Sequence, residues 1–226
     1  MCPVSLNLPW SYHESRSIEL SDVRNKRVIP CQVSQVPKGT LLTWFADGLG
    51  PNETQELLVR TAKTQDEQAT TRSGVIVQDH PSENRVDVFV KGRLFTSYHY
   101  GREWVRPFLH PVIGPGGVRT TRSWPIDKSM DSETADHPHH KSIWVAYGEC
   151  GRVDNWSEEP NHGWQRHKEF VKLLSGRIFG QIVVKNDWCT PQDRKQFEEI
   201  RDMRFYALGG GMGLFDFSVT FIMVQG

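Results

Sequence analysis

The chain has 226 residues, and its 27 basic side chains balance 27 acidic ones, with nine histidines besides. A chain without net charge has no field that attracts nucleic acid or an anionic membrane, so we expect neither as a partner. We expect a small-molecule or oligosaccharide ligand instead.

The length is sufficient for one all-β domain with a sizeable core, so we expect a single domain over residues 1–226, with residues 1–20 as an N-terminal extension. No stretch is long and apolar enough to span a bilayer as a helix, and the start of the chain lacks the pattern of a signal peptide. The default expectation is a cytoplasmic protein. The four cysteines form no C-x-x-C pair, so neither a disulfide framework nor a zinc knuckle is indicated.

Strand patterns dominate the sequence. The alternation in 85–90, followed by Lys91-Gly92 and the run 93–98, predicts a β-hairpin with a tight turn. Short strands at regular spacing predict a large antiparallel β-sandwich. The other predicted strands, in chain order, are 27–33, 40–45, 74–78, 142–147, 176–184, 203–207 and 215–224.

Two segments have helical signals. Residues 53–62 follow Asn52, a residue that favours a helix N-terminus, and residues 192–201 carry two apolar side chains three positions apart. The segments 119–138 and 155–162 are polar, contain proline and lack periodicity, so they are predicted to be long loops.

The strand predicted at 215–224 has no obvious pairing partner, and only two residues follow it. We therefore expect that further C-terminal strands are missing and that the chain is a fragment of a larger sandwich.

The most unusual segment is Asp136-His137-Pro138-His139-His140. In an extended backbone, which the proline favours, His137 and His139 point to one side and His140 to the other. Imidazoles in this arrangement can hold a metal ion, or can bind and protonate a substrate oxygen, and Asp136 can orient one ring. The alternative is a solvated loop that contains several histidines but has no functional role.

A metal site requires a third ligand beyond His137 and His139. The sequence offers Glu149, His110 and His162, none of them at a diagnostic spacing. The cofactor therefore stays unknown, with a divalent metal as one alternative.

Other polar and aromatic residues can complete a binding site. Arg106 and Arg122 can bind hydroxyl oxygens through their planar donor forks, although a structural role is the alternative for each. Trp156 and Trp164 lie in polar surroundings, where flat aromatic faces suit a sugar ring. Core packing is the alternative for tryptophans and is expected for Trp144.

Several of these motifs together resemble one family. The runs 121–125 (Thr-Arg-Ser-Trp-Pro), 136–144 (Asp-His-Pro-His-His-Lys-Ser-Ile-Trp) and 154–156 (Asp-Asn-Trp) resemble the PmoA-like family of soluble bacterial proteins, labelled "methane oxygenase PmoA". The resemblance implies a sandwich similar to galactose mutarotase and a role in carbohydrate use. The family usually has His-Gly-Asp where this chain has Tyr147-Gly148-Glu149, so no role at position 147 is carried over.

The leading hypothesis is a carbohydrate-active or carbohydrate-binding protein. His137, His139, His140 and Glu149 are the candidate catalytic residues for general acid/base chemistry, as in an isomerase, lyase or hydrolase. The first alternative is an iron or copper oxygenase that uses His137 and His139, and the second is a non-catalytic sugar-binding module. The expected substrate-binding residues are Arg106, His110, Arg122, Asp136, Trp156, His162 and Trp164.

Overall fold

The computed structural model describes residues 1–9, 17–36, 39–62, 73–130, 133–209 and 212–223. Antiparallel strands make up nearly all the regular structure in these ranges, which confirms the all-β prediction. None of the helices in the described part of the chain is both long and apolar enough to span a membrane. The strands are β1 (Cys2–Leu8), β2 (Ser17–Asp22), β3 (Val28–Ile29), β4 (Cys31–Val36), β5 (Gly39–Ala46), β6 (Leu57–Ala62), β7 (Val75–His80), β8 (Arg85–Val90), β9 (Arg93–His99), β10 (Phe108–Val112), β11 (Ile143–Trp144), β12 (Glu149–Cys150), β13 (Val153–Asp154), β14 (Trp164–Leu174), β15 (Phe179–Cys189), β16 (Lys195–Tyr206) and β17 (Leu214–Met223).

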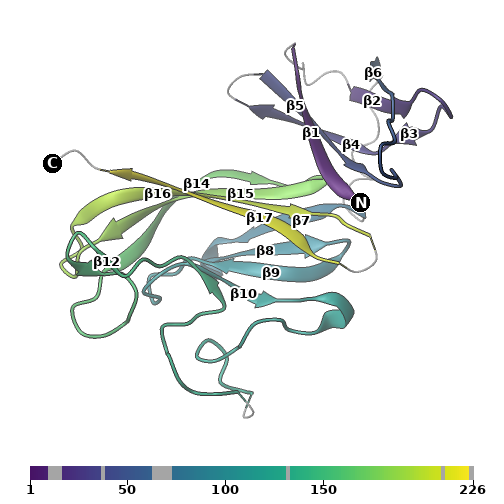
Figure 1. Cartoon of the computed structure of the whole chain (residues 1–226). Helices are drawn as coiled ribbons and strands as arrows, with labels where there is room; N and C mark the ends of the chain where they lie inside the picture. The colour runs from purple at the N-terminus through teal and green to yellow at the C-terminus, as the bar shows by residue number, and fades with distance from the viewer. Residues whose placement is uncertain (10–16, 37–38, 63–72, 131–132, 210–211, 224–226) are drawn as a thin grey trace.

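Two sheets face each other and form the main sandwich (Figure 1). One sheet has the order β11-β10-β9-β8-β7, and the other has the order β14-β15-β16-β17. Apolar side chains from both inner faces meet in one core, among them Val86 and Val88 from the first sheet and Ile182, Met203 and Phe205 from the second. Burial of such side chains is the main stabilising contribution to a sandwich.

The predicted hairpin is present as β8 and β9. Val90 pairs with Arg93, and the two turn residues Lys91 and Gly92 have φ angles of 51° and 75°. Positive φ at both positions is typical of a type I′ turn, which matches the twist of the strands that it joins.

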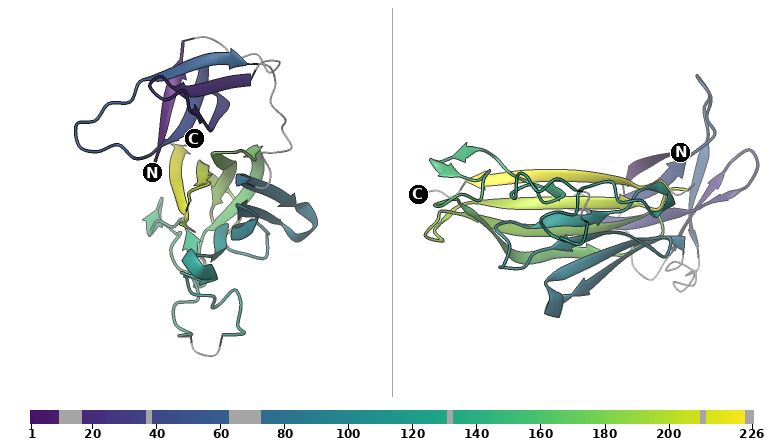
Figure 2. Two further views of the ribbon diagram at one scale, coloured as in Figure 1. Left: turned by 90° about the vertical axis from the view of Figure 1, so that its right-hand side faces the viewer. Right: turned by 90° about the horizontal axis from the view of Figure 1, so that it is seen from below.

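The N-terminal residues form two further sheets, β1-β5-β4 and β3-β2-β6, at one end of the sandwich (Figure 2). Leu8, Leu20 and Leu42 are the buried centre of a separate apolar cluster there. The expected N-terminal extension, residues 1–20, thus includes strand β1, and every residue of β1 pairs with β5. Residues 10–16 of this segment lie outside the described ranges. Whether the chain is one domain stays a prediction.

One side chain joins these sheets to the sandwich. Gln32 on β4 accepts hydrogen bonds from the backbone N–H groups of Ile178 and Phe179 at 2.9 and 3.0 Å and donates one to the Phe179 carbonyl at 3.0 Å. All of these groups are buried, so the Gln32 amide satisfies backbone groups that would otherwise be costly to bury.

Both helix predictions are wrong. Residues 57–62 form β6, which pairs with β2, and Asn52 has a φ of 63° in a turn rather than a helical cap. Residues 195–201 begin β16, which is paired on both sides. Pairing with neighbouring strands overrides weak local helix preference.

The strand predictions need smaller corrections. Residues 27–33 are divided at Pro30 into β3 and the start of β4, since proline lacks the N–H that a ladder requires. Of 142–147, only Ile143–Trp144 is a strand. The predicted strand 215–224 is β17, with residue 224 outside the described part. The loops expected at 119–138 and 155–162 contain no strand in their described residues, which exclude 131–132.

A buried ion pair interrupts the apolar face of β16. The Arg201 Nε donates to Glu199 Oε1 at 2.5 Å, and both side chains have no solvent exposure. Trp188 donates to the other Glu199 oxygen at 2.6 Å, while Arg201 donates to the Pro107 carbonyl at 3.2 Å and to the Gln165 amide oxygen at 3.3 Å. These partners compensate two charges that would otherwise be expensive to bury.

We expect Glu199→Gln to lower the free energy of unfolding by about 3 kcal/mol, because Arg201 would stay buried without a counter-charge. Urea unfolding followed by fluorescence measures this change. The matched control is Glu198→Gln on the adjacent, outward position, where the ion pairs to Lys168 and Lys195 are near the surface and the expected loss is below about 1 kcal/mol. Equal losses in the two variants would contradict the role assigned to the buried pair.

Candidate functional site

The three histidines of segment 136–140 lie on a tight turn. The His140 N–H donates to the His137 carbonyl at 2.9 Å, and His137 has a positive φ of 46°. The expected extended backbone is therefore wrong, and so is the expected division of the rings between two sides. The His137 and His140 rings stack at a centroid distance of 5.0 Å, and His139 meets His140 edge to face at 4.4 Å.

Two tryptophans complete what we call the His–Trp cluster, namely His137, His139, His140, Trp144 and Trp156. The Trp144 and Trp156 ring centroids are 5.3 Å apart, and each lies within 6.1 Å of both His139 and His140. Trp144 is on the short edge strand β11, whereas Trp156 is in the loop after β13 and is 46% exposed. The cluster is therefore open to solvent on the Trp156 side.

Arg106 holds the Trp156 loop from beneath. Its guanidinium donates to the carbonyls of Trp156 and Ser157 at 2.8 and 3.0 Å and lies 4.9 Å from the Trp144 ring. Only 1% of the side chain is exposed, and this burial lowers the pKa of Arg106 to about 10. The Arg106 guanidinium donates to backbone carbonyls of the protein, so we infer that Arg106 positions the Trp156 loop rather than binding a ligand directly.

Arg122 has a similar internal role. It donates to the Asp136 carboxylate at 2.5 Å and to the carbonyls of Thr134, Asp136 and His137 at 3.0–3.3 Å. The hydrogen bond from Arg122 is the main reason that the pKa of Asp136 is lowered. Asp136 Oδ2 is 3.8 Å from His137 Nε2, too far for the orienting hydrogen bond that we expected.

Next to the cluster is a charged pair, Lys141 and Glu158, that the sequence analysis did not predict. Lys141 is buried, forms a short ion pair with Glu158 and donates to the Pro138 carbonyl at 3.0 Å. Burial lowers the pKa of Lys141, although Glu158 opposes this shift. Glu158 also acts electrostatically on His139. A lysine adjacent to His140 and an acid adjacent to Ser157 are visible in the sequence, but their contact required the fold.

The imidazoles of His139 and His140 favour their neutral form. Burial is the largest cause that lowers the pKa of His139 and of His140, and the neighbouring histidines add to both shifts. Neutral imidazole has one donor and one acceptor nitrogen, so at neutral pH these rings can accept a proton as well as donate a hydrogen bond.

Three candidate residues lie apart from the cluster. Glu149 is an exposed residue of the β12–β13 hairpin, and His162 and Trp164 contact each other, with Arg166 stacked on Trp164 at 4.0 Å. No contact between these side chains and the three histidines occurs in the described ranges. Across the part of the chain that the structure describes, no group of three His, Cys, Asp or Glu side chains is arranged to hold a metal ion.

His110 is also separate, inside the sandwich on β10. It is 5% exposed, and its Nδ1 is buried without a hydrogen-bond partner among the described residues. Burial, followed by the effect of His99, lowers the pKa of His110 to about 4. The ring is therefore neutral at pH 7 and is placed as a core residue rather than as a ligand of the cluster.

We expect Arg106→Gln to loosen the Trp156 loop, since two carbonyls would lose charge-assisted donors. The free energy of unfolding should fall by about 2 kcal/mol, and amide hydrogen exchange over 155–159 should accelerate. The control is Arg102→Gln, an exposed cation four positions earlier whose side chain has no partner in the described residues. Unchanged exchange in Arg106→Gln would refute the positioning role.

The lowered pKa of His110 leads us to expect that the stability of the protein depends on pH. Its pKa is about 4 when folded and about 6.5 when unfolded, so the unfolded chain binds the extra proton in this window. Stability due to His110 is present above pH 6.5 and is lost as the pH falls towards 4. We expect His110→Leu to reduce the fall in unfolding free energy between pH 7 and pH 4 by about 3 kcal/mol, measured by urea unfolding at both values. An unchanged fall would show that His110 does not titrate in this way.

The comparisons with known proteins identify the family but no activity. The model of a family of unknown function, DUF6807, matches residues 85–226, from β8 through the end of the chain. No curated protein and no solved structure matches the chain. The family description names no reaction, so the resemblance to PmoA-like proteins stays a prediction. Because the match covers more than half of the chain, the protein belongs to the DUF6807 family.

Proposed function

We propose that the His–Trp cluster is a saccharide-binding site and that the protein is carbohydrate-active, as the PmoA-like resemblance implies. The observation that supports this most is the convergence of three imidazole rings and two indole rings at the surface. The rings come from two separate segments, the turn with its adjoining strand β11 and the loop after β13.

The chemistry of the cluster suits a sugar. A pyranose ring has apolar C–H faces that stack on aromatic rings and hydroxyl edges that need both donors and acceptors. Trp156 offers a half-exposed indole face, and neutral His139 and His140 offer both kinds of hydrogen-bonding nitrogen. No charged ligand is needed to explain this combination.

In the proposed reaction His139 is the general base. Its lowered pKa keeps the imidazole unprotonated at neutral pH, so it can take a proton from a bound sugar and later return it as a general acid. Glu158 replaces Glu149 as the acidic partner in this proposal, because it interacts with His139 whereas Glu149 is an exposed residue of the β12–β13 hairpin. Isomerase, lyase and hydrolase reactions all include such a step.

The oxygenase alternative receives no support from the described side chains. An open iron or copper site needs three convergent ligands, and the histidine rings instead pack against one another and against Trp144 and Trp156.

The test is calorimetric titration of the protein with glucose, galactose, xylose and their β-linked oligosaccharides. We expect one of these to bind, and we expect Trp156→Ala to weaken its binding about tenfold through the loss of stacking. Tyr147→Ala is the matched control, since Tyr147 is an exposed aromatic residue without a ring contact to the cluster in the described ranges. Absence of binding to every sugar, or binding that is indifferent to Trp156→Ala, would refute the site.

His139→Gln distinguishes catalysis from binding at the same cluster. Glutamine retains hydrogen bonding but cannot act as a base, so turnover of the bound sugar should disappear while its affinity changes little. Binding without turnover in the unmodified protein would identify a non-catalytic sugar-binding module.

A further inference from the structure

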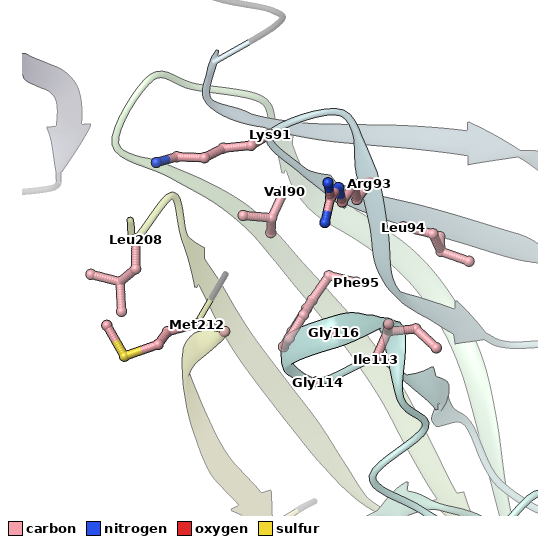
Figure 3. Close-up of a pocket in the computed structure, with 12 residues that line it drawn as sticks. Val90, Lys91, Arg93, Leu94, Phe95, Ile113, Gly114, Gly116, Leu208 and Met212 are labelled. Atoms are coloured by element: carbon pink, nitrogen blue, oxygen red, sulfur yellow. The ribbon is translucent and has the colours of Figure 1, made fainter. Parts of the chain in front are cut away.

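Apart from the His–Trp cluster, the sandwich has a cavity of about 350 Å³ where the β8–β9 turn approaches the segment after β10 and the segment after β16. Figure 3 shows Val90, Phe95 and Ile113 from the first two of these parts and Leu208 and Met212 from the third. Its volume falls within the range of small-molecule sites in proteins.

The apolar part of the cavity wall is well fixed. Phe95 packs edge to face on Phe205 and Phe215 at centroid distances of 6.0 and 5.9 Å. Gly213 lies so close to Phe95 that an added Cβ would be 2.3 Å from its ring. The aromatic wall is therefore held in place by the core, and a ligand would meet a preformed surface.

Two cations lie at the edge of the apolar wall. Lys91 and Arg93 line the cavity on the side of the hairpin turn. In Figure 3 the Lys91 side chain extends toward Leu208, whereas Arg93 lies on the side away from Leu208 and Met212. Neither side chain forms an ion pair with a described residue, and none of the described lining residues is acidic. Only Gly92 separates them, since Lys91 is in the type I′ turn and Arg93 is the first residue of β9.

The segment 114–117 leaves the floor of the cavity open. Gly116 and Gly117 have φ angles of 75° and 80°, which side-chain-bearing residues rarely adopt. Gly116 and Gly117 line the cavity without side chains of their own, so their backbone is accessible from it.

This cavity is separate from the His–Trp cluster. Phe108, at the start of β10, pairs with Trp144 of the cluster, whereas Ile113, just after the end of β10, lines the cavity. The chemistry differs too, because the cavity combines aliphatic side chains with positive charge.

We propose that this cavity binds a small amphipathic monocarboxylate. The carboxylate is bound by Arg93, whose planar fork matches its two oxygens, with Lys91 as a second positive charge. The hydrocarbon part lies on Val90, Phe95 and Leu208. A neutral sugar would leave the cations unmatched, and inorganic phosphate would leave the apolar wall uncovered.

The test uses octanoate as the probe in isothermal titration calorimetry, with 1-octanol and inorganic phosphate as comparisons. We expect octanoate to bind, and both comparison ligands to bind at least about tenfold more weakly because each matches only half of the site. Arg93→Gln should weaken octanoate binding about tenfold. Lys91→Asn should weaken it less and should preserve the turn, since asparagine tolerates positive φ.

Lys128→Gln is the control for a general change in charge, since Lys128 is exposed, outside the cavity and without an ion pair in the described ranges. It should leave octanoate affinity unchanged, and thermal melts confirm that each variant folds. Trp156→Ala should also leave octanoate binding unchanged, so the outcome is independent of the proposed saccharide site. Octanol binding equal to that of octanoate, indifference to Arg93→Gln, or no octanoate binding at all would overturn the proposal.

Discussion

The buried ion pair between Arg201 and Glu199 is the interaction on which the site most depends. Two charges between sheets are tolerated only where every donor and acceptor has a fixed partner, so this pair constrains the segments around it. Arg201 binds the Pro107 carbonyl and the Gln165 amide, and Gln165 in turn donates to the Val145 carbonyl at 2.7 Å. The core thereby fixes the backbone at Pro107, next to Arg106, and at Val145, next to Trp144 of the His–Trp cluster.

Arg106 extends this constraint to the surface. It precedes Pro107, whose carbonyl is held by Arg201, and its own guanidinium holds the carbonyls of Trp156 and Ser157. Hydrogen bonds from Arg201 and from Arg106, joined through the Arg106–Pro107 peptide, thus connect the middle of β16 to the backbone of Trp156. Such preorganisation matters for a binding surface, because a fixed aromatic face loses little conformational entropy when a ligand stacks on it.

The family match places both proposed sites in the same part of the chain. The His–Trp cluster and the residues that line the cavity at the β8–β9 turn all lie within 85–226, whereas the two N-terminal sheets precede this range. The sandwich therefore carries the polar aromatic cluster and the cationic apolar cavity at different places along β10. Two ligands of different chemistry can then be tested independently on one scaffold.

The sequence predicted strands well where alternation and turn residues agreed. The hairpin around Lys91-Gly92 is the best case, since both the period of two and the turn chemistry are local. Prediction failed for the first part of β16, residues 195–201, because its inward positions include Glu199 and Arg201, which hide the alternation of buried residues with Phe197 and Met203. Charged residues are usually exposed, so a sequence pattern predicts exposure even for two charged residues that are buried as an ion pair.

By itself, the sequence determined the all-β class, the β8–β9 hairpin and the unusual density of histidine and tryptophan between 136 and 164, because these depend on local pattern and composition. Only the tertiary structure decided how those residues meet. It turned the backbone at His137, brought Trp156 to the histidines, separated Glu149 from them and placed Lys141 against Glu158. These are contacts across loops whose course is set by hydrogen bonds of Arg106, Arg122 and Arg201, and such long-range partners leave no local signal in the sequence.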